Sequence, residues 1–567
     1  MDQSPSSSCA AIFSTCREAT GEVPRMNGIA IDALVIFAYF AVIIGIGLSQ
    51  RSKSGSVEGF ALGDRQTPWW AVLASILAAE ISAATFLGAP ESGYVKGNWT
   101  YAQFAIGTIL ARIIVSFLFI PLFYRHGVIS LYEYLGTRFG SRSRTWASAT
   151  FLVTRVLAMG TRLYVSAIIL VLAWQLWRGV AVSPWEKFWI FAGAVLLVTA
   201  MTALYTSIGG IRAVIWTDFI QVGVLVAALG FSVFFLLGKL PDGWTTATAH
   251  MKEPYFWNFA KPAADPGAWA WIKNVLTSEY TIWAAIIGST FVTMATHGID
   301  QDTVQRMLTA KNRRESARAT ILSGFVDLPV VGCFILVGIL VSAFYQTGGA
   351  ALPEGVVPRE AFPFFILTQM PAGMRGLVIA GIMATAMGSL STALNALGTS
   401  FARDFVIPWR ERRGAVTEDE RVRALRWSTV LFAGFIVLVG TATAYYMAHN
   451  PTAAIIPLVL GILGFTFGSL LALFFVAIFT RTRGNDFGNI LAMICGFAAV
   501  VFFSSGDLQK LMSFTTPGAD GQPAPLLVLA FPWRITLGTV VTFCVALCFR
   551  TSPAQLEKMR VEDATHA

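Results

Sequence analysis

The stretch WWAVLASILAAEISAATF, residues 69–86, decides the class of fold. Glu80 is its only charged residue, and the other side chains are apolar or small. A helix of about 20 such residues crosses the hydrocarbon core of a bilayer. An unpaired charge at that depth is costly, so it is expected to face a partner or a cavity. The stretch therefore predicts a membrane span that contains a paired or functional acid.

The composition of the whole chain agrees with a membrane protein. Of its 567 residues, 55% are hydrophobic and only 13% are charged, and the mean hydropathy is +0.64. Soluble chains carry about 25% charged residues. This composition excludes a disordered or collagen-like chain. The formal net charge of +9 does not require nucleic acid as a partner, because the basic residues follow a membrane topology.

Apolar windows of span length recur along the chain and predict an all-α integral membrane protein with about thirteen transmembrane helices. The predicted spans are residues 28–49, 68–89, 99–124, 146–174, 187–207, 212–238, 281–304, 319–345, 373–401, 427–447, 453–480, 485–504 and 530–549. Most of the 41 Lys and Arg residues fall in alternate loops, which the positive-inside rule assigns to the cytoplasm. The N-terminus is therefore predicted outside and the C-terminus inside.

The segments outside the spans are short. Residues 1–27 are predicted to form an extracytoplasmic tail, 239–280 an extracytoplasmic loop, and 550–567 a cytoplasmic tail. Six cysteines are too few for a disulfide scaffold in a chain of this length. Cys9 and Cys16 lie in the first tail, where pairing between them is left open, and the others lie in apolar segments and predict packing roles.

Four charged residues inside predicted spans stand out: Glu80, Arg155, Arg162 and Asp218. Glu80 could help to bind a cation, or it could be a buried acid paired with Arg155 or Arg162. Arg162 could grip a carboxylate through its guanidinium, while Arg155 could serve as a structural partner of Glu80 or Asp218. No Pro or Gly lies between Trp69 and Leu87, so the composition gives no sign of an unwound helix there.

Residues 380–404 form a span that is unusually rich in hydroxyl groups. Its polar residues recur at helical spacing and form one stripe: Thr385, Ser389, Thr392, Asn395 and Thr399. Such a stripe could offer oxygens to a small hard cation. It could equally let helices approach closely and hydrogen-bond across an interface. The pattern alone leaves both interpretations open.

Five separate segments, in order, together resemble the sodium:solute symporter family over most of the chain. They are GFALGDRQTPWWAVLASILAAEISAATFLGAP (59–90), SLYEYLGTRFG (130–140), GGIRAVIWTDFIQVGV (209–224), GIDQDTVQRML (298–308) and MGSLSTALNALGTSFARDF (387–405). The resemblance implies a LeuT-like fold with inverted five-helix repeats over 68–238 and 281–480. One extra helix, 28–49, would precede them, and two more within 485–549 would follow.

The same resemblance implies sodium sites. The first would use the carbonyls of Ala78, Ile81 and Thr385 and the hydroxyl of Ser389. A further hydroxyl residue that the family usually carries is Gly388 here, so one ligand is missing, and water or Glu80 could replace it. A second sodium site, known in some members, would match Asp218, Ser391 and Thr392. Na⁺ is the expected coupling ion, and no organic cofactor is expected.

For the substrate, the sequence looks most similar to the carriers of monocarboxylates and sialic acid. Arg162 matches an arginine that grips the carboxylate in sialic-acid members, and Ser82, Thr85 and Gln103 match positions that line the pocket. Thr293 and Thr296 stand where sugar carriers have an amide and a gate tyrosine. These two differences count against an ordinary neutral-hexose site without excluding sugars.

Together these features predict a sodium-coupled symporter of the cell membrane that imports a small organic solute, with a carboxylate-bearing one favoured. Its partners would be that solute, sodium and the lipid bilayer, but not nucleic acid. The alternatives are a sodium/sugar symporter, a proton-coupled carrier that uses Glu80, and a membrane sensor, which the short C-terminal tail disfavours. An enzyme is not expected, because His297 stands alone without a metal-ligand or nucleophile partner.

Overall fold

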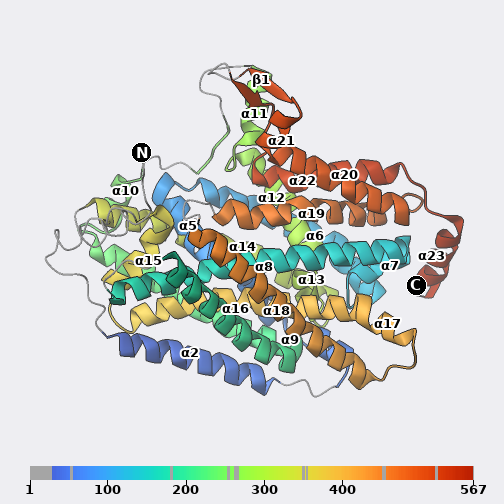
Figure 1. Cartoon of the computed structure of the whole chain (residues 1–567), viewed down its shortest axis with the longest axis horizontal. Helices are drawn as coiled ribbons and strands as arrows, with labels where there is room; N and C mark the ends of the chain where they lie inside the picture. The colour runs from blue at the N-terminus through green and yellow to red at the C-terminus, as the bar shows by residue number, and fades with distance from the viewer. Residues whose placement is uncertain are drawn as a thin grey trace.

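The computed structural model describes residues 28–50, 55–178, 183–251, 256–260, 267–347, 352, 356–449, 455–517 and 522–565. Within these ranges the chain is helical apart from short loops and one small hairpin, β1 (Thr515–Pro517) with β2 (Pro523–Pro525), as Figure 1 shows. The predicted tail 1–27, with Cys9 and Cys16, lies outside the described residues. The predicted all-α class is confirmed.

Long apolar helices and short connecting helices alternate in the first half of the chain. They are α2 (Ile29–Ser49), α3 (Val57–Leu62), η1 (Gly63–Arg65), α4 (Trp69–Glu80), α5 (Ala83–Lys96), η2 (Thr100–Gln103), α6 (Phe104–His126), α7 (Tyr132–Phe139), α8 (Ser141–Arg178), α9 (Pro184–Lys239), α10 (Trp244–Ala249) and α11 (Ala268–Thr277). The last two lie within the predicted loop 239–280, which therefore has helical structure of its own.

The second half follows the same pattern and adds two π-helical turns, η3 and η4. Its elements are η3 (Ala284–Gly288), α12 (Ser289–Gly298), α13 (Gln301–Met307), α14 (Arg313–Gln346), α15 (Pro358–Gln369), α16 (Met374–Phe401), η4 (Ala402–Val406), α17 (Ile407–Glu411), α18 (Glu418–His449), α19 (Ile455–Phe479), α20 (Asp486–Ser504), α21 (Gly506–Leu511), α22 (Phe531–Leu547) and α23 (Pro553–Thr565).

Each predicted span overlaps a helix of the structure. Among the described residues, nine helices are long and apolar enough to cross a membrane, or ten if the bent pair α4 and α5 forms one span. The predicted spans 187–207 and 212–238 both fall within α9, which is interrupted at Gly210 (φ 60°, ψ −152°). At 1.5 Å per residue, an unbroken α9 would far exceed the bilayer thickness. The number of spans and their orientation remain predictions.

The span that contains Glu80 is broken in the structure. Helix α4 ends at Glu80, Ile81 and Ser82 have extended backbones, and the following helix is bent by 62° relative to α4. The composition did not indicate this break, because no Pro or Gly lies there. An extended Ile81 (φ −79°, ψ 93°) withholds the next helical N–H groups, so the last carbonyls of α4 lose their usual donors.

Helix α16 forms the centre of the bundle. In its most apolar window 94% of the residues are buried inside the protein, and the helix packs against α2, α4, α8, α9 and α18. Figure 1 shows α16 beside α8 and α18, with α2 at one edge of the bundle. A helix so enclosed can carry hydroxyl groups only where they bond to carbonyls or face a polar site. The predicted stripe lies on this helix.

The interruption of α9 predicts a specific need for glycine. Gly210 has backbone angles that are almost confined to glycine, and a Cβ there would lie 2.5 Å from the carbonyl oxygen of Phe60. Gly210→Ala should therefore lower the stability of the protein by about 1–3 kcal/mol. Thermal unfolding of the purified protein in detergent measures this loss.

Gly223→Ala is the matched control, because Gly223 lies in the same helix with nothing within 4 Å of an added Cβ. It should leave the unfolding temperature unchanged or raise it slightly, since alanine favours helix. Equal unfolding temperatures for the two variants would contradict the strained turn at Gly210.

Candidate functional site

The end of α4 lies directly against α16. A Cβ built on Gly388 of α16 would lie 3.2 Å from the carbonyl oxygen of Ala78 and 3.4 Å from its Cβ. One residue further along α16, the hydroxyl of Ser389 donates to the carbonyl of Thr385 at 2.8 Å. Ile81 is buried at the break itself. The predicted first sodium site thus falls where the freed carbonyls of α4 meet a hydroxyl-bearing face of α16.

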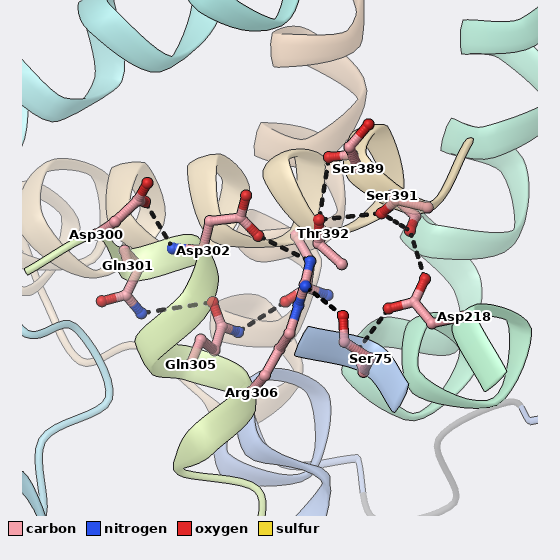
Figure 2. Close-up of polar contacts among 12 residues, drawn as sticks. Ser75, Asp218, Asp300, Gln301, Asp302, Gln305, Arg306, Ser389, Ser391 and Thr392 are labelled. Atoms are coloured by element: carbon pink, nitrogen blue, oxygen red, sulfur yellow. Dashed lines mark hydrogen bonds and ion pairs between the residues drawn. The ribbon is translucent and has the colours of Figure 1, made fainter. Parts of the chain in front are cut away.

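A second oxygen-rich cluster lies next to the first and joins three helices. The buried carboxylate of Asp218, on α9, accepts a hydrogen bond of 2.5 Å from Ser75 of α4 and one of 3.5 Å from Ser391 of α16. Figure 2 shows this arrangement. The hydroxyl of Thr392 bonds instead to the carbonyls of Gly388 and Ser389 within α16. The structure therefore brings Asp218 and Ser391 together.

Ser75 was missed by the sequence analysis, although one signal could have found it. It lies three residues before Ala78 on α4, so a helix places both on one face. Arg306 of α13 was also missed. Its fully buried guanidinium donates to the carbonyl of Ser75 at 2.6 Å and pairs with Asp302 at 3.0 Å, and it acts electrostatically on Asp218. This arginine balances the negative charge of the second cluster.

The far end of the hydroxyl stripe has a different role. Gln305 of α13 donates through its amide to the carbonyl of Ala61 at 2.6 Å and to the side chain of Asn395 at 2.7 Å. It also contacts the hydroxyl of Thr399 at 3.3 Å. The later residues of the stripe tie α16 to α13, so the interhelical interpretation is confirmed for them. The hydroxyls of its earlier residues bond to carbonyls of α16 itself, and their role as cation ligands stays a prediction.

The predicted partners of Glu80 are wrong. Glu80 forms an ion pair with Arg112 of α6, and His297 lies 3.9 Å from its carboxylate. Arg155 pairs instead with Asp300, at 2.9 Å, and with Asp302. The alternative partnership of Arg155 with Asp218 is wrong for the same reason. Spacing along the chain could not show that the acid of α4 faces α6 rather than α8.

Arg162 differs from the other arginines inside the bundle. Its side chain makes no hydrogen bond or ion pair in the part of the chain that the structure describes, and its Nε atom is buried. Arg155, seven positions earlier on α8, is already held by two carboxylates. Of the two arginines on this face of α8, Arg155 is in ion pairs, whereas Arg162 makes none among the described residues and has Asp300 as its electrostatic neighbour.

The other predicted substrate residues are placed separately. Ser82 and Thr85 lie at the break between α4 and α5. Gln103 is held by loops, because its amide donates to the carbonyl of Thr100 and accepts from the backbone of Asn258. On α12, the hydroxyl of Thr296 contacts the ring of His297 at 3.1 Å and the carbonyl of Thr293 at 3.4 Å. No described hydrogen bond joins these groups to Arg162, so a shared pocket remains a prediction.

Carbonyl, hydroxyl and carboxylate oxygens of this kind suit a small hard cation, and broken membrane helices commonly supply such ligands. A helix bundle with a broken span against an oxygen-rich central helix defines an ion-coupled membrane transporter. The sequence model of the sodium:solute symporter family matches residues 60–496, and the chain belongs to this family. The predicted membership is thereby confirmed.

Relatives of known function agree with this class. The chain is 27% identical to the sodium/sialic acid symporter NanT of Aliivibrio fischeri, over 84% of this chain and 88% of the relative. It is 25% identical to the sodium/glucose cotransporter 4 of Mus musculus, over 96% of this chain and 79% of the relative. The protein is a multi-pass membrane symporter coupled to sodium and not an enzyme.

A solved structure confirms the LeuT-like fold. It is the substrate-bound, outward-open state of a sodium-coupled sialic acid symporter, with a TM-score of 0.71 and 24% identity. The similarity covers 91% of this chain and 97% of that one. The fold class is thus established, while the substrate and the ligands of each site are matters for proposal.

The pairing of Glu80 makes a stability prediction. Arg112 is fully buried, so Glu80→Gln would remove its ion-pair partner and leave only the electrostatic interaction with Asp327, which should cost up to about 3–5 kcal/mol. The double variant Glu80→Gln with Arg112→Met removes both charges and should recover most of this loss. Thermal unfolding of the purified variants in detergent measures both effects.

The same double variant separates a structural role from proton coupling. With a structural pair, it should retain sodium-driven transport. If Glu80 carries the coupling proton, the variant should fold well and yet lose coupled transport. A Glu80→Gln variant as stable as the unmodified protein would contradict the ion pair itself.

Proposed function

We propose that this symporter imports a small carboxylate-bearing solute together with Na⁺ by alternating access. The observation that carries the proposal is Arg162, an arginine within the bundle that makes no hydrogen bond or ion pair among the described residues, although Asp300 acts on it electrostatically. A guanidinium inside the membrane normally pairs with an acid. Its planar donors match a carboxylate in two-pronged fashion, so an anionic solute is the natural partner.

The proposed first sodium site lies where it can couple the ion to the solute. Na⁺ bound by the carbonyls of Ala78 and Ile81, the carbonyl of Thr385 and the hydroxyl of Ser389 would hold the broken span against α16. Ser82 and Thr85, proposed to line the solute pocket, immediately follow this break. Sodium would therefore order the solute site, and the solute would raise the affinity for sodium by the same factor.

We assign a possible second sodium ion to the cluster of Asp218, Ser391 and Thr392, with Ser75 as an added ligand. The carboxylate and the two serine hydroxyls already converge there, which supports the assignment. Thr392 is the weakest member, because its hydroxyl, unlike that of Ser391, makes no hydrogen bond to Asp218 among the described residues. Transport with two sodium ions per solute follows if both sites fill.

Two alternatives belong in the same test. The relatives include a sodium/glucose cotransporter, so a sugar is the alternative substrate of this chain. A proton-coupled carrier would need Glu80 to exchange a proton. The ion pair of Glu80 with Arg112 opposes that role, because a proton on Glu80 would take away the ion-pair partner of a buried arginine.

Uptake into proteoliposomes tests the function directly. The purified full-length protein should accumulate a labelled acidic solute against its gradient only when an inward sodium gradient is present. The panel contains sialic acid, lactate, glucose and proline, each with a sodium gradient, a proton gradient or neither. Accumulation of glucose alone would favour the sugar alternative, and a proton requirement would favour the proton-coupled one. No accumulation under any condition would reject the proposal.

Arg162 gives the sharpest prediction about the substrate. Arg162→Ala should lower the uptake of the acidic solute by about 10- to 100-fold, because a charge-assisted bond to the carboxylate is lost. Arg162→Lys, which keeps the charge and loses the planar fork, should give an intermediate rate. Initial rates of sodium-driven uptake provide the measurement.

Arg178→Ala is the matched control on the same helix, since Arg178 is partly exposed and pairs with Glu186. This variant should transport at the unmodified rate. Full activity in Arg162→Ala would contradict the carboxylate assignment.

A further inference from the structure

The proposed first sodium site lacks a side-chain ligand at Gly388, and the structure shows what lies in the space that a side chain would fill. A Cβ on Gly388 would lie 2.9 Å from the Oε1 atom of Gln221 and 3.2 Å from the carbonyl oxygen of Ala78. Because both oxygens lie close to this one point, they are within about 6 Å of each other. Gln221 therefore reaches from α9 into the gap between α4 and α16.

The side chain of Gln221 has unused hydrogen-bonding capacity. The residue is 2% exposed, yet both its amide oxygen and its amide nitrogen lack a hydrogen-bond partner in the described part of the chain. The hydroxyls of Tyr39 and Tyr205 interact with this amide, but their geometry is too poor for a full hydrogen bond, and the Tyr39 hydroxyl is directed at the sulfur of Met387. A buried amide without partners is costly, so its presence indicates a ligand.

Gln221 also stands in a fixed relation to the second cluster. It follows Asp218 by three residues on α9, so both side chains project from one face of that helix. The carboxylate of Asp218 contacts Ser75 and Ser391, while Gln221 lies against Gly388. One face of α9 thus contributes an oxygen toward each of the two proposed cation positions.

We propose that the amide oxygen of Gln221 is a ligand of the first sodium ion and replaces the hydroxyl that is missing at Gly388. This inference rests on the proposed sodium site. An amide oxygen resembles a backbone carbonyl in charge and polarity, so it adds a neutral ligand of the same kind as those of Ala78 and Ile81. A residue larger than glycine at 388 would displace the amide, so the site would tolerate there only a side chain that brings an oxygen of its own.

Sodium affinity of the purified full-length protein tests the proposal, with binding of radiolabelled sodium in detergent as the measurement. Gln221→Met keeps the volume and removes the oxygen, and it should weaken sodium affinity at least fivefold. Gln221→Glu keeps an oxygen and should bind sodium at least as tightly as the unmodified protein. If Gln221 serves only to fill space, Gln221→Met should bind sodium as tightly as the unmodified protein, and that result would overturn the proposal.

A compensating pair makes the test more specific. Gln221→Ala should weaken sodium binding, and adding Gly388→Ser should restore most of the affinity, because the serine hydroxyl enters the vacated space. Gly388→Ser alone should change the affinity by less than about threefold, since it exchanges one oxygen for another. Independent, additive effects of the two substitutions would overturn the proposal.

Two further variants separate this inference from the proposed sodium site. Thr199→Val removes a buried, unpartnered hydroxyl in the other half of α9 and should leave sodium binding unchanged. Ser389→Ala should weaken binding whichever residue supplies the missing ligand. If Ser389→Ala weakens binding and Gln221→Met does not, the role of Gln221 is overturned and the site stands. If neither weakens binding, both the site and the role are overturned.

Discussion

Carbonyl groups inside a bilayer must have partners, and this constraint governs the rest of the structure. Water is absent from the hydrocarbon core, so a helix that breaks there is tolerated only where protein or a bound ion satisfies its backbone. Helix α4 ends at Glu80. Its final turn packs against α16 at Gly388, where no side chain separates the two helices. The break, the contact and the oxygen cluster around them are therefore parts of a single arrangement.

Charge compensation organises the surroundings of this break. Glu80 pairs with Arg112, Arg306 balances the region of Asp218, and Arg155 is held by two carboxylates. Each of these groups would be costly alone, so the pairs hold α4, α6, α8 and α13 in defined positions. Arg162 makes no ion pair among the described residues, and it is therefore the residue against which the proposed anionic solute is placed.

The class of fold and many candidate residues could be predicted from the sequence, because apolar windows and polar residues within them are local features. The break after Glu80 could not, since no Pro or Gly lies there and a single serine such as Ser82, which starts α5, is also common inside membrane spans. The sequence also could not show which residue each buried charge pairs with, since Glu80 pairs with Arg112 rather than with Arg155 or Arg162. The predicted Asp218 and Ser391 do meet. Gln221 could be recognised as a candidate ligand only from the structure, which places its amide beside Gly388.

The ion pairs of Arg155 with Asp300 and Asp302 link α8 to the segment around the start of α13. Any rearrangement that parts these elements would bring two carboxylates and a guanidinium into contact with water. Hydration of the separated ions offsets much of the lost attraction, because burial had already cost them their solvation. These ion pairs can therefore separate without a large loss of free energy, provided that water reaches them. Entry of water is then the step that controls their separation.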